Sequence, residues 1–183
     1  LIALLMIVVP TGLYFRDVAK QVAFYQREES SLNSVVTLLR LTRSVRDHRG
    51  LSTGVLSGND AAESQRLAAR DQVRQGLDAL QTALTSIQAS EGLLDLLRNM
   101  RTEWTALERG VVAKEFTPVQ SMYKHSAWVD RALTMNAQIQ AEFGLALDPE
   151  IDNHYLIQSA LVDVPLLAEH LGQLRGFGAL YLG

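Results

Sequence analysis

The sequence contains no cysteine, and its 17 lysines and arginines are outnumbered by 20 aspartates and glutamates. The absence of cysteine excludes disulfide frameworks and thiolate metal sites, and it is compatible with an oxidising compartment without proving one. The formal net charge is −3, and the cationic residues are scattered among the acidic ones. A nucleic-acid-binding domain usually carries a concentrated basic patch. We therefore expect no nucleic-acid partner.

Catalytic and metal-binding motifs are also missing. The four histidines show no HExxH spacing, and the chain has no Glu-x-x-His pair of the kind that di-iron bundles use. The sequence also lacks a glycine-rich phosphate loop and a serine in a nucleophile elbow. These absences predict that the protein is not an enzyme and that it holds neither a metal nor a cofactor.

No segment alternates apolar and polar residues as a strand does, whereas apolar residues recur at three-and-four spacing along most of the chain. The clearest stripes are Val73, Leu77, Leu80, Leu84 and Ile87; Leu93, Leu97, Met100, Trp104, Leu107 and Val111; and Trp128, Ala132, Met135, Ile139 and Phe143. We expect Trp104, Trp128 and Met135 to lie in the core.

The breaks between the stripes are short, at residues 57–60, 89–92, 117–118 and 147–150. Thr117 is predicted to cap a helix that has Pro118 in its first turn. Because short connections place successive helices side by side in opposite directions, the sequence predicts an all-α, up-down antiparallel four-helix bundle. Its first helix should end near Leu56.

The first fifteen residues are uncharged, and the chain has no initiator methionine. At a rise of 1.5 Å per residue this run spans about 22 Å, short of the ~30 Å hydrocarbon core of a bilayer. It is predicted to be the distal part of a membrane helix, with Tyr14, Phe15 and Arg16 at the interface. A signal peptide fits less well because no Ala-x-Ala site follows. A buried helix of a soluble domain is the other alternative.

This pattern divides the chain into three parts. Residues 1–15 are predicted to be a truncated transmembrane helix, and residues 16–146 the first helical-bundle module. Residues 147–183 should begin a second, incomplete helical module. Within its helix, Pro165 should either produce a kink or follow a new helix start capped by Asp163.

The sequence Arg-Gly occurs at Arg49-Gly50 and again at Arg175-Gly176, and each of these arginines falls in a heptad stripe. The first stripe is Ser31, Val35, Leu38, Thr42, Val45, Arg49, Ser52 and Leu56. A shift of 126 positions gives Ile157, Leu161, Val164, Ala168, Leu171, Arg175, Gly178 and Leu182. The agreement in register predicts an internal repeat with both arginines on buried seams.

Two buried guanidinium groups without partners would be costly, so together they would favour a planar oxyanion that accepts bidentate hydrogen bonds. The candidate ligand-binding residues are therefore Arg49, Arg175, His48 and Ser52. Gly50 and Gly176 would allow close helix approach.

Alternatives remain open for each of these side chains. Either arginine could place its head in water or pair with a carboxylate, of which the candidates are Asp47, Glu169, Asp148 and Asp152. His48 lies one position off the stripe, which favours a solvated or helix-pairing role over ligand contact.

Several short motifs resemble a known family. They are Asp47-His48-Arg49-Gly50-Leu51-Ser52, Val55-Leu56-Ser57-Gly58, Gln65-Arg66-Leu67 and Leu171-Gly172-Gln173-Leu174-Arg175-Gly176. Together they resemble the nitrate- and nitrite-sensing helical domains of bacterial chemotaxis receptors, sensor histidine kinases, cyclic-dinucleotide enzymes and antiterminators. Residues 147–156 are similar to a segment common in the extracytoplasmic domains of chemoreceptors. The resemblance covers roughly residues 35 to 183.

The resemblance implies an extracytoplasmic input domain, anchored in the bacterial inner membrane and located in the periplasm or outside the cell. A small anion such as nitrate, nitrite or a carboxylate would bind between helices at Arg49 and Arg175, and a helix displacement would reach a cytoplasmic output domain. A homodimer is expected.

The alternative function is a membrane-anchored dimerisation or protein-interaction module without a small ligand. Arginines neutralised by acids within the fold would favour this module. A cavity walled by Arg49 and Arg175 would favour the sensor.

Overall fold

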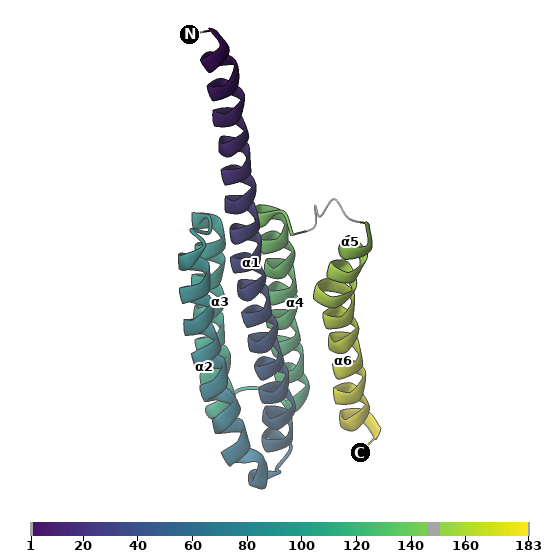
Figure 1. The fold of residues 1–183 in the computed structure, drawn as a ribbon. Helices are drawn as coiled ribbons and strands as arrows, with labels where there is room; N and C mark the ends of the chain where they lie inside the picture. The colour runs from purple at the N-terminus through teal and green to yellow at the C-terminus, as the bar shows by residue number, and fades with distance from the viewer. Residues whose placement is uncertain (1, 146–150, 183) are drawn as a thin grey trace.

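The computed structural model describes residues 2–145 and 151–182, which form an all-α fold of six antiparallel-packed helices (Figure 1). The helices are α1 (Ile2–Leu56), α2 (Glu63–Ser86), α3 (Glu91–Val112), α4 (Pro118–Phe143), α5 (Ile151–Gln158) and α6 (Val164–Leu182). A 3-10 turn, η1 (Asp60–Ala62), precedes α2, and a π-helical turn, η2 (Ser159–Asp163), joins α5 to α6. The predicted all-α class is confirmed. The predicted break at 147–150 lies outside the described residues.

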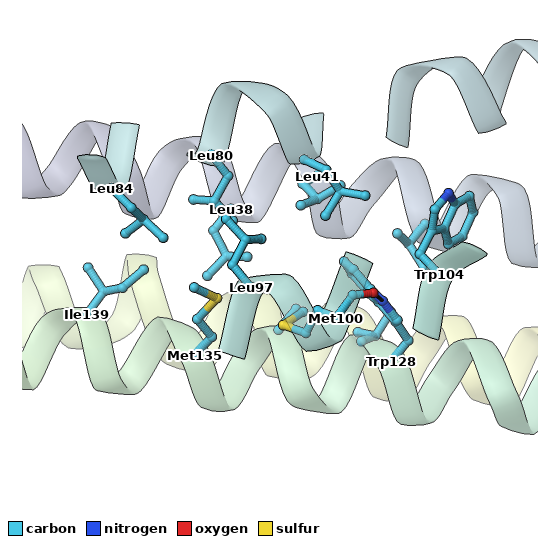
Figure 2. Close-up of a cluster of buried hydrophobic side chains, with 14 of the residues drawn as sticks. Leu38, Leu41, Leu80, Leu84, Leu97, Met100, Trp104, Trp128, Met135 and Ile139 are labelled. Carbon is cyan, nitrogen blue, oxygen red and sulfur yellow. Dashed lines mark hydrogen bonds between the residues drawn. The ribbon is translucent and has the colours of Figure 1, made fainter. Parts of the chain in front are cut away.

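The core runs along the centre of the α1–α4 bundle, where apolar stripes from the four helices meet (Figure 2). Leu38 and Leu80 are fully buried, as expected for helices that present one apolar face to a shared interior. Trp104, Trp128 and Met135 are at most 2% exposed, which confirms their predicted place in the core. The indole N–H of Trp128 donates to the carbonyl oxygen of Met100 at 2.9 Å, so this buried polar group is satisfied.

The helix boundaries have local causes in the sequence. Thr117 and Gln120 form a capping box at the start of α4, with Pro118 in the first turn, as predicted for Thr117. Gly144 ends the same helix with φ 74°, a left-handed conformation that glycine adopts without steric cost. Ser90 caps α3 by accepting a hydrogen bond from the backbone N–H of Leu93.

The first helix is much longer than its neighbours, and its N-terminal part projects beyond the bundle (Figure 1). Its side chains at positions 9–17 are exposed. No helix in the described part of the chain is both long enough and apolar enough to span a membrane. The membrane anchor therefore stays a prediction.

The α5–η2–α6 rod packs along α4 and α1 on one side of the bundle (Figure 1). Pro165 has no N–H to give the carbonyl of Leu161, which would be its partner in α-helical register. The side chain of Asn136 donates to that carbonyl oxygen at 2.6 Å instead. The N–H of Val164 bonds to the carbonyl of Ser159, and η2 runs directly into α6, so the helix does not start anew after Asp163. The π turn of η2 thus lies directly before Pro165, and the chain stays helical through the proline.

The two heptad stripes differ in burial. On α1, the residues from Ser31 to Ser52 of the stripe are buried, as predicted. On α6, Leu171 is 57% exposed and Arg175 is exposed, so the prediction of a second buried seam is wrong. The physical reason is that α6 is covered on one side only, by α1 and α4.

Candidate functional site

A cleft of about 830 Å³ lies between α1 and α6. Its charged lining residues are Arg43, Arg46, Asp47 and Arg49 from α1 and Arg175 from α6. The remaining lining residues are small, hydroxylated or apolar: Gly50, Thr53, Gly54, Ser57, Met122, Ala168, Leu171, Gly172, Gly176, Ala179 and Leu180. Because four guanidinium groups face one carboxylate, the cleft has an excess of positive charge.

Arg49 is 3% exposed and is paired inside the fold. Its Nη1 donates to Glu169 Oε1 at 2.5 Å and to Ser126 Oγ at 2.8 Å. The guanidinium therefore ties α1 to both α4 and α6. The alternative in which an acid such as Glu169 neutralises a seam arginine applies to Arg49.

Glu169 is fully buried, and its Oε1 also accepts from Gln173 Nε2 at 2.8 Å. Its Oε2 has no hydrogen-bond partner among the described residues. Gly172 makes room for the ion pair, because a Cβ at this position would lie 2.8 Å from Arg49 Nη2. The close approach of α6 to α1 at Gly172 therefore keeps the pair out of water.

Arg175 lies on the opposite wall of the cleft, on α6. It is exposed, so it is not on the buried seam that was predicted, and it makes no ion pair within the described residues. Gly176 does permit close packing, because a Cβ there would collide with the side chain of Met122. A Cβ on Gly50 would meet nothing within 4 Å, so Gly50 has no such role and opens onto the cleft instead.

His48 and Ser52 are fully buried and do not line the cleft. His48 Nδ1 lies 2.9 Å from His125 Nε2 on α4 and 3.1 Å from Ser52 Oγ. Of the two roles weighed for His48, helix pairing matches this geometry and solvation does not. The four predicted site residues therefore separate into Arg49 and Arg175 at the cleft, and His48 and Ser52 inside the bundle.

The contacts of the two histidines fix the positions of their protons. His125 Nδ1 lies 2.7 Å from the carbonyl oxygen of Ser121, so this nitrogen must donate. In a neutral ring, His125 Nε2 then accepts, and His48 Nδ1–H is its donor. His48 Nε2 in turn accepts from Arg66 Nη1 at 3.3 Å. The result is a directed chain from Arg66 through both imidazoles, in which each ring is neutral.

Burial and neighbouring charge keep both rings neutral. Burial, with smaller contributions from His125, Arg66 and Arg70, lowers the pKa of His48 to about 2. Burial also lowers the pKa of His125 to about 4, although the carbonyl of Ser121 acts in the opposite direction. A second proton on either ring would face another N–H donor, so the pKa directions agree with the geometry.

Arg66 is 1% exposed and is held by two hydrogen bonds to Glu63, both of 2.7 Å. These bonds raise the pKa of Arg66 and lower the pKa of Glu63. Glu108 Oε1 on α3 lies 3.7 Å from Arg66 Nη1, so α3 also contributes to this group of buried polar side chains. A buried polar layer thus crosses the bundle beside the cleft.

Three arginines, Arg43, Arg46 and Arg49, lie close together on the α1 wall of the cleft. Burial lowers the pKa of Arg46; among its neighbours, Glu169 and Asp47 raise the pKa, whereas Arg49 and Arg43 lower it. Arg43, Arg46 and Arg175 make no ion pair within the described residues. An anion in the cleft would therefore favour the charged form of a partly buried guanidinium group on this wall.

Arg43, Arg46 and His125 were not among the predicted site residues, and Arg66 was named only as part of the motif Gln65-Arg66-Leu67. A signal for the first two existed, because positions 43, 46, 50, 53 and 57 follow three-and-four spacing and form one polar helix face. His125 lies three positions before Trp128 and so extends the apolar stripe of α4. No local signal marks Arg66 as buried.

The cleft presents cations and apolar surface, and in the described part of the chain no three His, Cys, Asp or Glu side chains are grouped to hold a metal ion. The chain matches no family model, no curated protein and no solved structure.

Proposed function

We propose that this chain is the extracytoplasmic ligand-sensing domain of a bacterial transmembrane receptor. A small anion, such as nitrate, nitrite or a small carboxylate, binds in the cleft between α1 and α6. Its binding moves one helix, and this displacement crosses the inner membrane to an output domain. The domain itself is not an enzyme and takes no cofactor.

One observation carries the proposal. Arg43, Arg46 and Arg49 of α1 face Arg175 of α6 across a single cleft, in which Asp47 is the one lining acid among the described residues. Guanidinium groups bind oxyanions with bidentate geometry. An anion here would link α1 to α6.

The helix arrangement supplies a route for the signal. The wall that carries Arg46 belongs to α1, whose N-terminal part projects from the bundle (Figure 1). The facing wall belongs to α6, which is covered on one side only. A ligand that changes the spacing between these helices therefore acts on α1 directly.

Ligand binding can be measured as thermal stabilisation. At 100 times the dissociation constant, a ligand of the folded state adds about 2.7 kcal/mol of stability, which raises the Tm of a domain of this size by roughly 5–10 °C. We expect nitrate, nitrite or acetate to do so at constant ionic strength, and Arg175→Ala to abolish the shift.

The matched control is Arg74→Ala, because Arg74 is an exposed arginine of α2 outside the cleft. This variant should keep the full shift. Arg49→Ala is a poor test, since it leaves Glu169 buried without its cation and destabilises the fold directly. A Tm that stays constant across all three anions contradicts the proposal.

A second candidate function is a membrane-anchored dimerisation module without a small ligand. Two observations favour it: Arg49 is already neutralised by Glu169, and α5 and α6 expose a set of large apolar side chains. These are Tyr155, Leu156, Val164, Leu166, Leu167, Leu171, Leu174 and Tyr181. A module of this kind would self-associate through the α5–α6 face.

A further inference from the structure

The internal pairing of Arg49 limits what it offers to a ligand. Its Nη1 is already bonded to Glu169 and Ser126, and its Nη2 lies against Gly172. An anion in the cleft would therefore meet the carboxylate of Glu169 behind Arg49. The guanidinium groups left to bind it are those of Arg43, Arg46 and Arg175.

The size of the cleft does not suit a four-atom ion alone. Nitrate fills about the space of two water molecules, ~60 Å³, whereas the cleft, which is open to solvent, has a volume of about 830 Å³. Clefts of roughly 300–1,000 Å³ are typical of organic ligands that bury most of their surface. Most of this volume would stay filled with water around nitrate.

The walls of the cleft differ in chemistry. The α1 wall carries the cations, whereas α6 contributes Ala168, Leu171, Ala179 and Leu180 beside Arg175. Met122 of α4, which is buried and packs against Gly176, adds to the apolar part. A ligand that fits both walls has an anionic head and an apolar body.

We propose that the ligand of this cleft is an organic monocarboxylate with an apolar body, and not an inorganic oxyanion. Its carboxylate pairs with Arg46 and Arg175, and its hydrocarbon part lies against Leu171, Leu180 and Met122. This inference rests on the proposed anion-sensing function and names the ligand class.

Calorimetric titration at constant ionic strength tests it with acetate, butyrate, hexanoate, nitrate and neutral hexanamide. Each buried methylene contributes about 0.8 kcal/mol, or about fourfold in affinity. Hexanoate should therefore bind more than tenfold more tightly than butyrate, and nitrate and hexanamide should both bind far more weakly than hexanoate.

Substitutions at two leucines of equal exposure test whether the apolar wall of the cleft, and not α6 in general, contacts the ligand. Leu171 and Leu167 are both 57% exposed and lie one turn apart, but only Leu171 lines the cleft. Leu171→Asn should weaken hexanoate at least fivefold and leave acetate unchanged, whereas Leu167→Asn should leave both unchanged. Arg175→Gln should weaken every carboxylate at least tenfold.

The outcomes distinguish this inference from the function on which it rests. If nitrate binds as tightly as hexanoate and Arg175→Gln weakens both, the anion sensor stands and the organic ligand class is wrong. Equal affinity for acetate and hexanoate overturns the inference in the same way. If no anion binds, or if binding is insensitive to Arg175→Gln, both proposals fail.

Discussion

His48 and His125 are two imidazoles that the fold holds neutral in its interior. Each ring has its nitrogen atoms committed, one as donor and one as acceptor, and each has a pKa below the ordinary value of 6.5. In the unfolded chain both rings would be exposed to water and would bind protons below about pH 6.5. The two histidines therefore link folding to pH.

We predict that acid destabilises the domain through these two residues. Below pH 6.5 the unfolded state binds more protons than the folded state. The free energy of unfolding is therefore highest above pH 6.5 and falls as the pH decreases toward 4. The slope should be about 1.4 kcal/mol per pH unit for each histidine. Urea unfolding between pH 4.5 and 7.5 measures it.

The variant His125→Gln should reduce this slope, since one of the titrating rings is gone. His170→Gln is the control, because His170 is exposed on α6, and it should keep the wild-type slope. A stability that does not change between pH 4.5 and 6.5 would show that the rings are not held neutral in the folded state.

At the scale of the elements, Pro165 and Asn136 form a matched pair on α6 and α4. Proline has no N–H to donate to the carbonyl oxygen of Leu161, and the buried side-chain amide of Asn136 donates to that oxygen instead. Asn136 Oδ1 in turn accepts from Gln140 Nε2 at 3.1 Å. This contact fixes the height of the α5–α6 rod along α4.

We predict that Asn136→Ala lowers the free energy of unfolding by about 1–3 kcal/mol, because a buried carbonyl loses its donor. In a Pro165→Ala background the penalty should be smaller, since the substituted residue would restore the backbone N–H. Chemical denaturation of the two single variants and the double variant measures the coupling. Additive effects would mean that Asn136 does not compensate for Pro165.

The elements also show what the sequence could and could not predict. The stripes of α2, α3 and α4 were predictable, because a helix enclosed by several neighbours buries one continuous face. Thr117 and Pro118 were predictable from local capping chemistry. The exposure of Leu171 and Arg175 was not, because a heptad register says which residues share a face and not whether another helix covers that face.

The candidate site shows the same limit. The Arg-Gly repeat led to the cleft, since Arg49 and Arg175 both line it. The choice of Glu169 over other acids as the partner of Arg49 depends on how α6 is placed against α1, across 120 residues of sequence. The burial of His48 depends likewise on the packing of α4, because its position one residue off the stripe left open whether it would face solvent or pair with a neighbouring helix.

At the scale of the whole molecule, the α5–α6 face leaves large apolar side chains in water, with Leu174 70% exposed and Tyr181 69% exposed. Contiguous exposed apolar surface is characteristic of association sites. Apart from Leu171, which lines the cleft, these side chains lie outside the cleft, so they are available to a second copy of the chain.

We predict that the domain forms dimers in solution through this face and that Leu174→Glu converts them to monomers. Sedimentation velocity over a range of protein concentrations measures the change. Val112→Glu is the control, because Val112 is 57% exposed at the end of α3, away from this face. Dimers that persist in Leu174→Glu would place the interface elsewhere, and a wild-type monomer at every concentration would exclude it.

The length of α1 has a mechanical consequence. Its 55 residues form one helix about 80 Å long at 1.5 Å per residue, so Arg46 and the projecting end are parts of the same rod. The backbone hydrogen bonds of a helix resist twisting, and a rotation imposed at the Arg46 turn reaches the far end through the same shaft. Under the proposed function, a ligand bound beside α6 would use the N-terminal part of α1 as a lever arm.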